Sequence, residues 1–200
     1  MKKTLSIIAS LLLFVTGGNA QVMLDDFESN QFGWTETTQR GGLAVIKDGV
    51  MRLEAKGSGT VYATCYAPFD YNKPFILSCD VLADKINSYP EFGLLFDYED
   101  DQNYIKFILY RESAVLVRMV AGNEVAKKTE DLKLNKGKGI GLQIEVEYTL
   151  NELTFRVNGV KALSYRRRVA YGEFLLGTSG IGFYAGLGQK VSFDNLKIEQ

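Results

Sequence analysis

Hydrophobic and polar residues alternate along almost the whole chain with a period of two. The alternation is clear in "GVMRLEA" (49–55), "PFILSCDVLA" (74–83) and "IGLQIEVEY" (140–148), and glycine-containing breaks separate such runs. This pattern predicts short, half-buried β-strands joined by turns. About a dozen strands without a long amphipathic helix predict an all-β antiparallel β-sandwich, whose two sheets bury their apolar faces on each other. The stretches 121–135 and 164–178 have no clear period, and each is compatible with a short helical turn.

Two short signals predict local backbone geometry. The pair Asn158-Gly159 lies between two alternating runs and predicts a tight hairpin, because both residues tolerate positive φ. Near the end of the chain the apolar alternation slips by one residue between Phe193 and Leu196, at Asp194-Asn195. Such a slip predicts a β-bulge in the last strand.

The first twenty residues have the pattern of a secretory signal peptide. Lys2 and Lys3 precede an apolar run from 5 to 15, and a small residue, Ala20, follows. We expect residues 1–20 to be removed and the protein to be soluble and secreted or periplasmic. Gln21 stands where a lipoprotein signal would need cysteine, so we do not expect a lipid anchor.

The remaining residues, 21–200, have the length of one β-sandwich domain. Without the two basic residues of the signal peptide, 21 basic residues face 24 acidic ones, which gives a net charge near −3. That balance gives no indication of nucleic acid or an anionic membrane as a partner, and no later apolar run is long enough for membrane insertion.

The chain contains no histidine. Catalysis by Ser-His-Asp or Cys-His groups is therefore excluded, as are histidine-rich zinc sites. Two cysteines, Cys65 and Cys79, occur in a chain that we expect to be exported, where thiols often pair. The alternation around Cys79 places it in the core, and the sequence is compatible with either a disulfide or two buried thiols.

The order of several motifs resembles that of the concanavalin A-like lectin/glucanase superfamily, and most closely its secreted laminin G-like members. The motifs are "LDDFESNQFGWTE" (24–36), "VIKDGVMRLEA" (45–55), "GLLFDYEDDQNYIKFILY" (93–110), "LTFRVNGVKAL" (153–163) and "SGIGFYAGLGQKVSFDNLKIEQ" (179–200). The resemblance implies a jelly roll, with carbohydrate bound across the concave face in many members.

Two enzyme groups are related to this superfamily. Family 16 glycoside hydrolases carry Glu-x-Asp-x-x-Glu on one strand, and no position of this chain has acidic residues at that spacing. Glu145 and Glu147 share a strand face and are the carboxylates that a glycoside hydrolase would use here. The chain also resembles 3-keto-disaccharide hydrolase-like domains at Gly33-Trp34 and Asp48-Gly49, but "DDFESNQF" replaces their usual opening.

The stretch 104–110 has one wholly apolar face and one mixed face. Ile105, Phe107 and Leu109 are expected in the core, so that Tyr104, Lys106 and Tyr110 face outward, where tyrosine rings could stack on sugars. Charged side chains on the same or neighbouring strands could bind sugar hydroxyls. The predicted ligand-binding residues are Tyr104, Lys106, Tyr110, Arg118, Glu145 and Glu147. The alternative is an ordinary half-polar sheet surface.

Three further features are predicted to be structural. Trp34, the only tryptophan, is expected to fill the core beside the chain entry. The acidic run 97–103 is expected to form a solvated turn before a strand. In superfamily relatives the first and last strands are neighbours and often hold a structural calcium. The resemblance therefore implies Asp25, Asp26 and Asp194 as calcium ligands. The alternative is a β-bulge at Asp194 without a metal ion.

The sequence thus favours a secreted carbohydrate-binding or accessory module in polysaccharide use, with a glycan as partner and no cofactor except the structural calcium. Two alternatives stay open. One is a glycoside hydrolase that acts through carboxylates, and the other is a structural or protein-binding β-sandwich.

Overall fold

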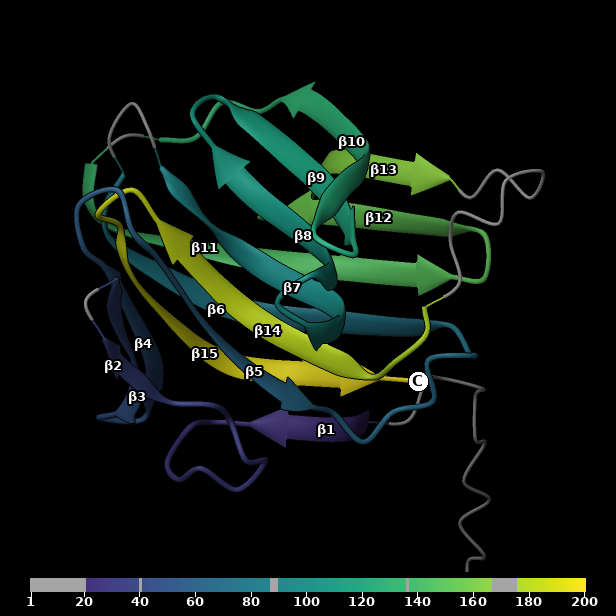
Figure 1. Ribbon diagram of the computed structural model, residues 1–200, viewed down its shortest axis with the longest axis horizontal. Coiled ribbons are helices and arrows are strands. Elements are labelled where there is room, and N and C mark those ends of the chain that lie inside the picture. The colour runs from purple at the N-terminus through teal and green to yellow at the C-terminus, as the bar shows by residue number, and fades with distance from the viewer. Residues whose placement is uncertain (1–20, 40, 87–89, 136, 167–175) are drawn as a thin grey trace, which may run out of the picture.

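Two antiparallel β-sheets lie face to face in a computed structural model of the chain (Figure 1). The structure describes residues 21–39, 41–86, 90–135, 137–166 and 176–200. In spatial order the nine-stranded sheet contains β13 (Val160–Arg166), β12 (Glu152–Val157), β11 (Gly137–Thr149), β6 (Phe75–Ile86), β15 (Lys190–Glu199), β4 (Val50–Ala55), β3 (Gly42–Lys47) and β2 (Thr37–Gln39), and β1 (Gln21–Asp25) also pairs with β15. The six-stranded sheet contains β10 (Asn123–Asp131), β9 (Ser113–Val120), β8 (Asn103–Tyr110), β7 (Glu91–Asp100), β14 (Gly180–Gly186) and β5 (Thr60–Tyr66). The predicted all-β antiparallel sandwich is confirmed.

Aromatic rings from both sheets meet in the core between them. Phe107 of β8 stacks on Phe155 of β12 with ring centroids 4.1 Å apart, and Phe183 of β14 stacks on Phe193 of β15 at 4.2 Å. All four side chains are fully or almost fully buried. Because each pair joins strands of different sheets, these contacts set how the two layers sit on each other.

Trp34 packs into this core, as predicted. Its ring stacks on Phe183 at 4.9 Å, and the indole N–H donates a hydrogen bond of 2.7 Å to Oδ2 of Asp25. The other carboxylate oxygen of Asp25 accepts a hydrogen bond from the backbone N–H of Phe27 at 3.0 Å. Asp25 is therefore a buried acid whose two oxygens both have donors.

The predicted turn and bulge are both present. Asn158 and Gly159 have φ values of 52° and 74°, and they connect the paired residues Val157 and Val160. The pairing of β15 with β6 shifts between Asp194 and Lys197, where Asn195 has a φ of 49° and its N–H donates to Asp194 Oδ1 at 2.7 Å. The Asp-Asn pair thus forms a bulge stabilised by a local hydrogen bond.

The two stretches without clear period have different outcomes. Residues 121–135, which the sequence left ambiguous, contain strand β10 and not a helical turn. Strand β10 lies at the sheet edge and is exposed along most of its length, which removes the apolar alternation. In 164–178, the residues up to Arg166 end strand β13, and 167–175 lie outside the described residues. The predicted signal peptide, 1–20, also lies outside them. Within the part of the chain that the structure describes, no helix is long and apolar enough to cross a membrane.

The two cysteines are free thiols in the core. Cys65 lies on β5 and Cys79 on β6, in different sheets, and both side chains are buried. Of the two alternatives that the sequence allowed, the structure has the buried thiols. Burial raises the pKa of Cys65 to about 12 and raises that of Cys79 further, which makes both thiols poor nucleophiles.

Candidate functional site

Strand β8 separates a core face from an outward face in the way the sequence predicts. Ile105, Phe107 and Leu109 are at most 1% exposed and belong to the main core. The outward positions lie next to other outward positions in register, with Lys106 opposite Leu95 of β7 and opposite Val117 of β9. The outer face of the six-stranded sheet therefore carries a second, smaller apolar cluster, which tyrosines surround.

Five tyrosines from four strands gather on this outer face, which we call the tyrosine face. They are Tyr62 of β5, Tyr98 of β7, Tyr104 and Tyr110 of β8, and Tyr184 of β14. The ring centroids of Tyr62 and Tyr98 lie 6.1 Å apart, and those of Tyr98 and Tyr104 lie 6.5 Å apart in a stacked arrangement. Tyr62, Tyr98 and Tyr104 thus form a row of three rings that runs across β5, β7 and β8.

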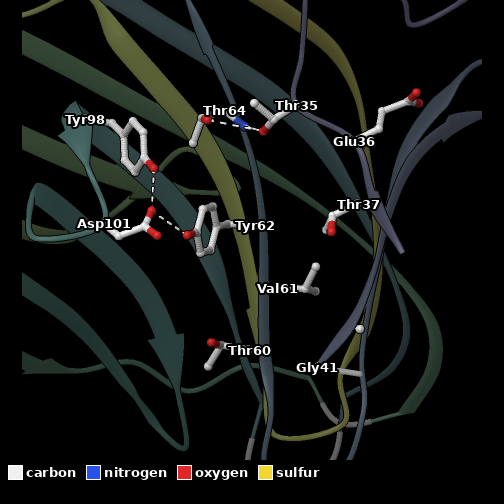
Figure 2. A pocket seen from close by; sticks show the side chains of 11 residues that line it. Thr35, Glu36, Thr37, Gly41, Thr60, Val61, Tyr62, Thr64, Tyr98 and Asp101 are labelled. Atoms are coloured by element: carbon white, nitrogen blue, oxygen red, sulfur yellow. Dashed lines mark hydrogen bonds between the residues drawn. The ribbon is translucent and has the colours of Figure 1, made fainter. Parts of the chain in front are cut away.

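Asp101 joins two of these rings. Its Oδ1 accepts hydrogen bonds from the hydroxyls of Tyr62 at 2.5 Å and Tyr98 at 2.6 Å, as Figure 2 shows. The two donors lower the pKa of Asp101, while burial and this carboxylate raise the pKa of Tyr62 to about 12 and raise that of Tyr98 more. The phenols are therefore neutral donors and Asp101 is a carboxylate near neutral pH.

Lys106 lies over another ring of the face. Its Nζ is 4.5 Å from the centroid of Tyr184, whose hydroxyl donates a hydrogen bond of 2.6 Å to Oε1 of Glu91. Tyr184 lies opposite Gly93 of β7 and is itself only 6% exposed, so Lys106 covers most of what the ring would otherwise present. Burial lowers the pKa of Lys106, and the negative charges of Glu91 and Glu124 partly offset this effect.

Three hollows adjoin one another along the tyrosine face. The central one, of about 270 Å³, is lined by Thr60, Tyr62, Leu95, Tyr98, Asp101, Tyr104, Lys106 and Tyr184. A larger one, of about 650 Å³, shares Tyr104 and Lys106 with it and extends over β9 and β10 as far as Lys127. The third, of about 300 Å³ (Figure 2), shares Tyr62, Tyr98 and Asp101 with the central one and extends towards Thr35 and Thr37. Aromatic surface and polar groups thus line adjoining hollows on this side of the sheet.

Of the six predicted ligand-binding residues, Tyr104, Lys106 and Tyr110 lie together on this face. Arg118 does not, because it lies opposite Ile105 and so belongs to the core-facing positions of β9; Met119 stands beside Tyr104 instead. Arg118 lines a separate hollow of about 480 Å³ with Asp97, and Tyr104 borders this hollow as well. The structure therefore places Arg118 beside the tyrosine face rather than on it.

Asp97 shapes this separate hollow. Its Oδ1 accepts hydrogen bonds from the backbone N–H groups of Gly177, at 2.5 Å, and Thr178, at 3.1 Å. Burial raises the pKa of Asp97, and these two donors and Arg118 oppose that effect. Asp97 thus fastens the segment before β14 to the end of β7.

Glu145 and Glu147 lie on the other sheet. Both are on β11, on the outer side of the nine-stranded sheet, where they alternate with buried residues. Arg156 of β12 binds both, with Nη1 2.8 Å from Oε1 of Glu145 and Nη2 2.9 Å from Oε2 of Glu147. The two carboxylates share a face as the sequence predicts, but this face lies across the sandwich from Lys106.

The three acids predicted to hold calcium make hydrogen bonds with nearby backbone or indole N–H groups. Asp25 binds Trp34 and Phe27, Asp26 Oδ1 accepts from the N–H of Glu28 at 3.2 Å, and Asp194 accepts from Asn195. Strand β1 pairs with β15, so the first and last strands are neighbours as implied. Among the described residues, no group of three or more His, Cys, Asp or Glu side chains is arranged to hold a metal ion. Structural calcium stays a prediction.

The acidic run 97–103 contains the turn that the sequence predicts. Asp100 Oδ1 accepts hydrogen bonds from the N–H of Gln102 at 2.7 Å and from the amide of Asn103 at 2.9 Å, between β7 and β8. Sequence reasoning missed that Asp101, in the same turn, binds two tyrosines.

Four other members of the tyrosine face were also missed, namely Tyr62, Glu91, Tyr98 and Tyr184. Every residue of β14 is buried, so no alternation distinguishes the outward position of Tyr184. Tyr98 follows a shift in strand pairing after Phe96, where Asp97 has a φ of 48°, and this shift changes the alternation. The signal available in the sequence was the repeated tyrosine in strand-like segments.

No protein-family model matches the chain, and no curated protein matches it either. The chain is similar in structure to a protein of unknown function with a galectin-like fold from Bacillus subtilis, with a TM-score of 0.68 and 12% identity over 92% of this chain and 97% of that one. It is similar to the carbohydrate-binding module CBM66 from Bacillus subtilis, with a TM-score of 0.58 and 13% identity over 86% and 98%.

A third similar structure comes from work on endo-acting O-glycanases, which prominent members of the human gut microbiota express to initiate mucin breakdown. Its TM-score is 0.63, with 12% identity over 90% of this chain and 99% of that one. At these identities the similarities show the fold, which is a galectin-like jelly roll consistent with the concanavalin A-like architecture.

Proposed function

We propose that the protein is a carbohydrate-binding module and that the tyrosine face is its glycan-binding surface. The observation that carries this proposal is the gathering of five tyrosines with Lys106, Glu91 and Asp101 on one outward sheet face. A tyrosine ring offers an apolar surface to the C–H groups of a sugar and a hydroxyl to its polar edge. Ordinary strand surfaces alternate such rings with solvated charges, whereas here the rings border adjoining hollows.

The similar structures support the same proposal. One is a carbohydrate-binding module, and another comes from work on enzymes that break down mucin. This chain matches nearly the whole length of both. A domain of this size that binds glycan without catalysing its cleavage acts as an accessory module that holds polysaccharide near other enzymes.

Export is part of the proposal and rests on the signal-peptide pattern of residues 1–20. Mass spectrometry of the protein exported by a host cell tests it. We expect a mature N-terminus near Gln21 and no uncleaved precursor in the exported fraction.

A glycan array probed with residues 21–200 tests the proposed binding. We expect binding to a defined set of glycans, and a loss of about tenfold or more in affinity for Tyr104→Ala, since a well-placed aromatic contact contributes roughly 1 to 3 kcal/mol. Leu82→Ala, at a half-exposed position of β6 on the other sheet, is the matched control and should bind like wild type. An array without any binding, or equal binding by Tyr104→Ala, would contradict the proposal.

A further inference from the structure

Lys106 stands where two hollows of the tyrosine face meet. Its side chain lines both the central hollow and the 650 Å³ hollow, and it is half-buried between them. Its ammonium group lies over the Tyr184 ring. Across the described residues, it makes no hydrogen bond and no ion pair.

Two carboxylates that line these hollows have other partners. Glu91 accepts the hydroxyl of Tyr184, and Asp101 accepts the hydroxyls of Tyr62 and Tyr98. An ammonium group has three donors, and a π face satisfies none of them as a hydrogen-bond acceptor does. These hydrogen bonds occupy the two carboxylates, and among the described residues the ammonium of Lys106 has no hydrogen-bond acceptor.

The charges around the larger hollow favour an anion. Three cations line it, namely Lys106, Arg111 and Lys127, and Arg111 lies over the Tyr110 ring at 5.0 Å. Two acids line it, Glu91 and Glu124. The lining of the larger hollow therefore carries one more cation than acid.

We propose that Lys106 binds the carboxylate of an acidic sugar, so that the ligand of the tyrosine face is a uronate-containing glycan. The proposal rests on the proposed function, because it names the class of glycan that the same face takes. Tyr104, which lines both hollows, holds the sugar ring, and the ammonium forms a charge-assisted hydrogen bond with the sugar carboxylate in a partly desolvated site.

Paired polymers test this inference. Polygalacturonate, alginate and hyaluronan are each compared with a carboxyl-reduced preparation of the same polymer, which has the same linkages but no charge. Affinity electrophoresis and calorimetry at 150 mM salt should show at least tenfold tighter binding to one or more of the uronate polymers than to its reduced form, in line with a charged hydrogen bond of about 1.5 to 3 kcal/mol.

Lys106→Met removes the ammonium and keeps the apolar stem. We expect this variant to bind the charged and the reduced polymer equally weakly, and Lys138→Gln, an exposed lysine on β11, to bind like wild type. The affinity of wild type for the uronate polymer should fall as pH rises through the lowered pKa of Lys106, because the ammonium then loses its proton. The affinity of Lys106→Met should not fall over the same pH range.

Four results would overturn the inference. Equal binding of wild type to charged and reduced polymers, or a preference for neutral glycans on the array, would contradict recognition of an acidic sugar. Either result would leave the proposed carbohydrate binding unaffected. Equal binding to heparin and to carboxyl-reduced heparin would indicate recognition of sulfate or of charge in general. No binding to any polymer or array glycan would overturn the proposed function as well. The polymer comparison uses wild type alone, so it stands even where Lys106→Met folds poorly.

Discussion

The indole N–H of Trp34 donates a 2.7 Å hydrogen bond to the buried carboxylate of Asp25. The same carboxylate accepts the N–H of Phe27, so one acid fixes both the ring that packs on Phe183 and the backbone that follows β1. Strand β1 pairs with β15 and thereby lies beside the last strand of the chain. The contact joins the start of the domain to its core.

Replacing Asp25 by alanine should destabilise the domain by about 2 to 4 kcal/mol. The change leaves two buried N–H donors without an acceptor, and each such loss costs roughly 1 to 3 kcal/mol. Urea unfolding followed by the fluorescence of Trp34 measures the change. Asp26→Ala is the control, because Asp26 is exposed and accepts only the local N–H of Glu28, so we expect a loss below about 1 kcal/mol. Equal losses for the two variants would contradict the proposed role of Asp25.

Asp101→Ala should weaken glycan binding about fivefold, since the hydroxyls of Tyr62 and Tyr98 lose their common acceptor and their orientation. The hydrogen bonds lower the pKa of Asp101, so their contribution is fully present above the ordinary carboxyl pKa of about 4 and is lost as pH falls through the lowered value. Calorimetric affinities of wild type should therefore be constant from pH 7 to about 4 and fall at lower pH. If Asp101→Ala loses affinity over the same acidic pH range, another group causes the loss.

Both cysteines should be unreactive in the folded protein. Burial raises the pKa of Cys65 to about 12, and Cys79 is almost fully buried, so neither forms a thiolate at pH 8. We expect Ellman's reagent to detect no thiol in the native protein and two in guanidinium chloride without reductant. Fewer than two thiols in the denatured protein would indicate a disulfide instead.

The sequence predicted features that depend on neighbouring residues. The Asn158-Gly159 turn, the slip at Asp194-Asn195 and the outward position of Lys106 each follow from a few adjacent positions, and the structure has all three. Features that depend on strand order were not accessible. Alternation shows that Glu145 faces outward, but not which sheet contains it.

Arg118 shows a second limit of the same kind. Register decides which residues of one strand face the same side of the sheet as given residues of its neighbour. The pairing of β8 with β9 places Arg118 opposite the core residue Ile105. The pairing shift after Phe96 likewise brings Tyr98 onto the tyrosine face, where a strict period of two would not place it. Register and bulges therefore determined which predicted residues came together.

The ion pairs of Arg156 with Glu145 and Glu147 separate the binding proposal from the glycosidase alternative. Both carboxylates lie on the nine-stranded sheet, away from the tyrosine face, and each is within 3 Å of the guanidinium. We expect Glu145→Gln and Glu147→Gln each to leave glycan affinity unchanged and to lower the free energy of unfolding by less than about 1 kcal/mol, because the pairs are partly exposed. Reducing-sugar release from any glycan that the array identifies should be at background for wild type and both variants. Release by wild type that either variant abolishes would instead make these carboxylates catalytic and place the active site on the opposite face from the tyrosines.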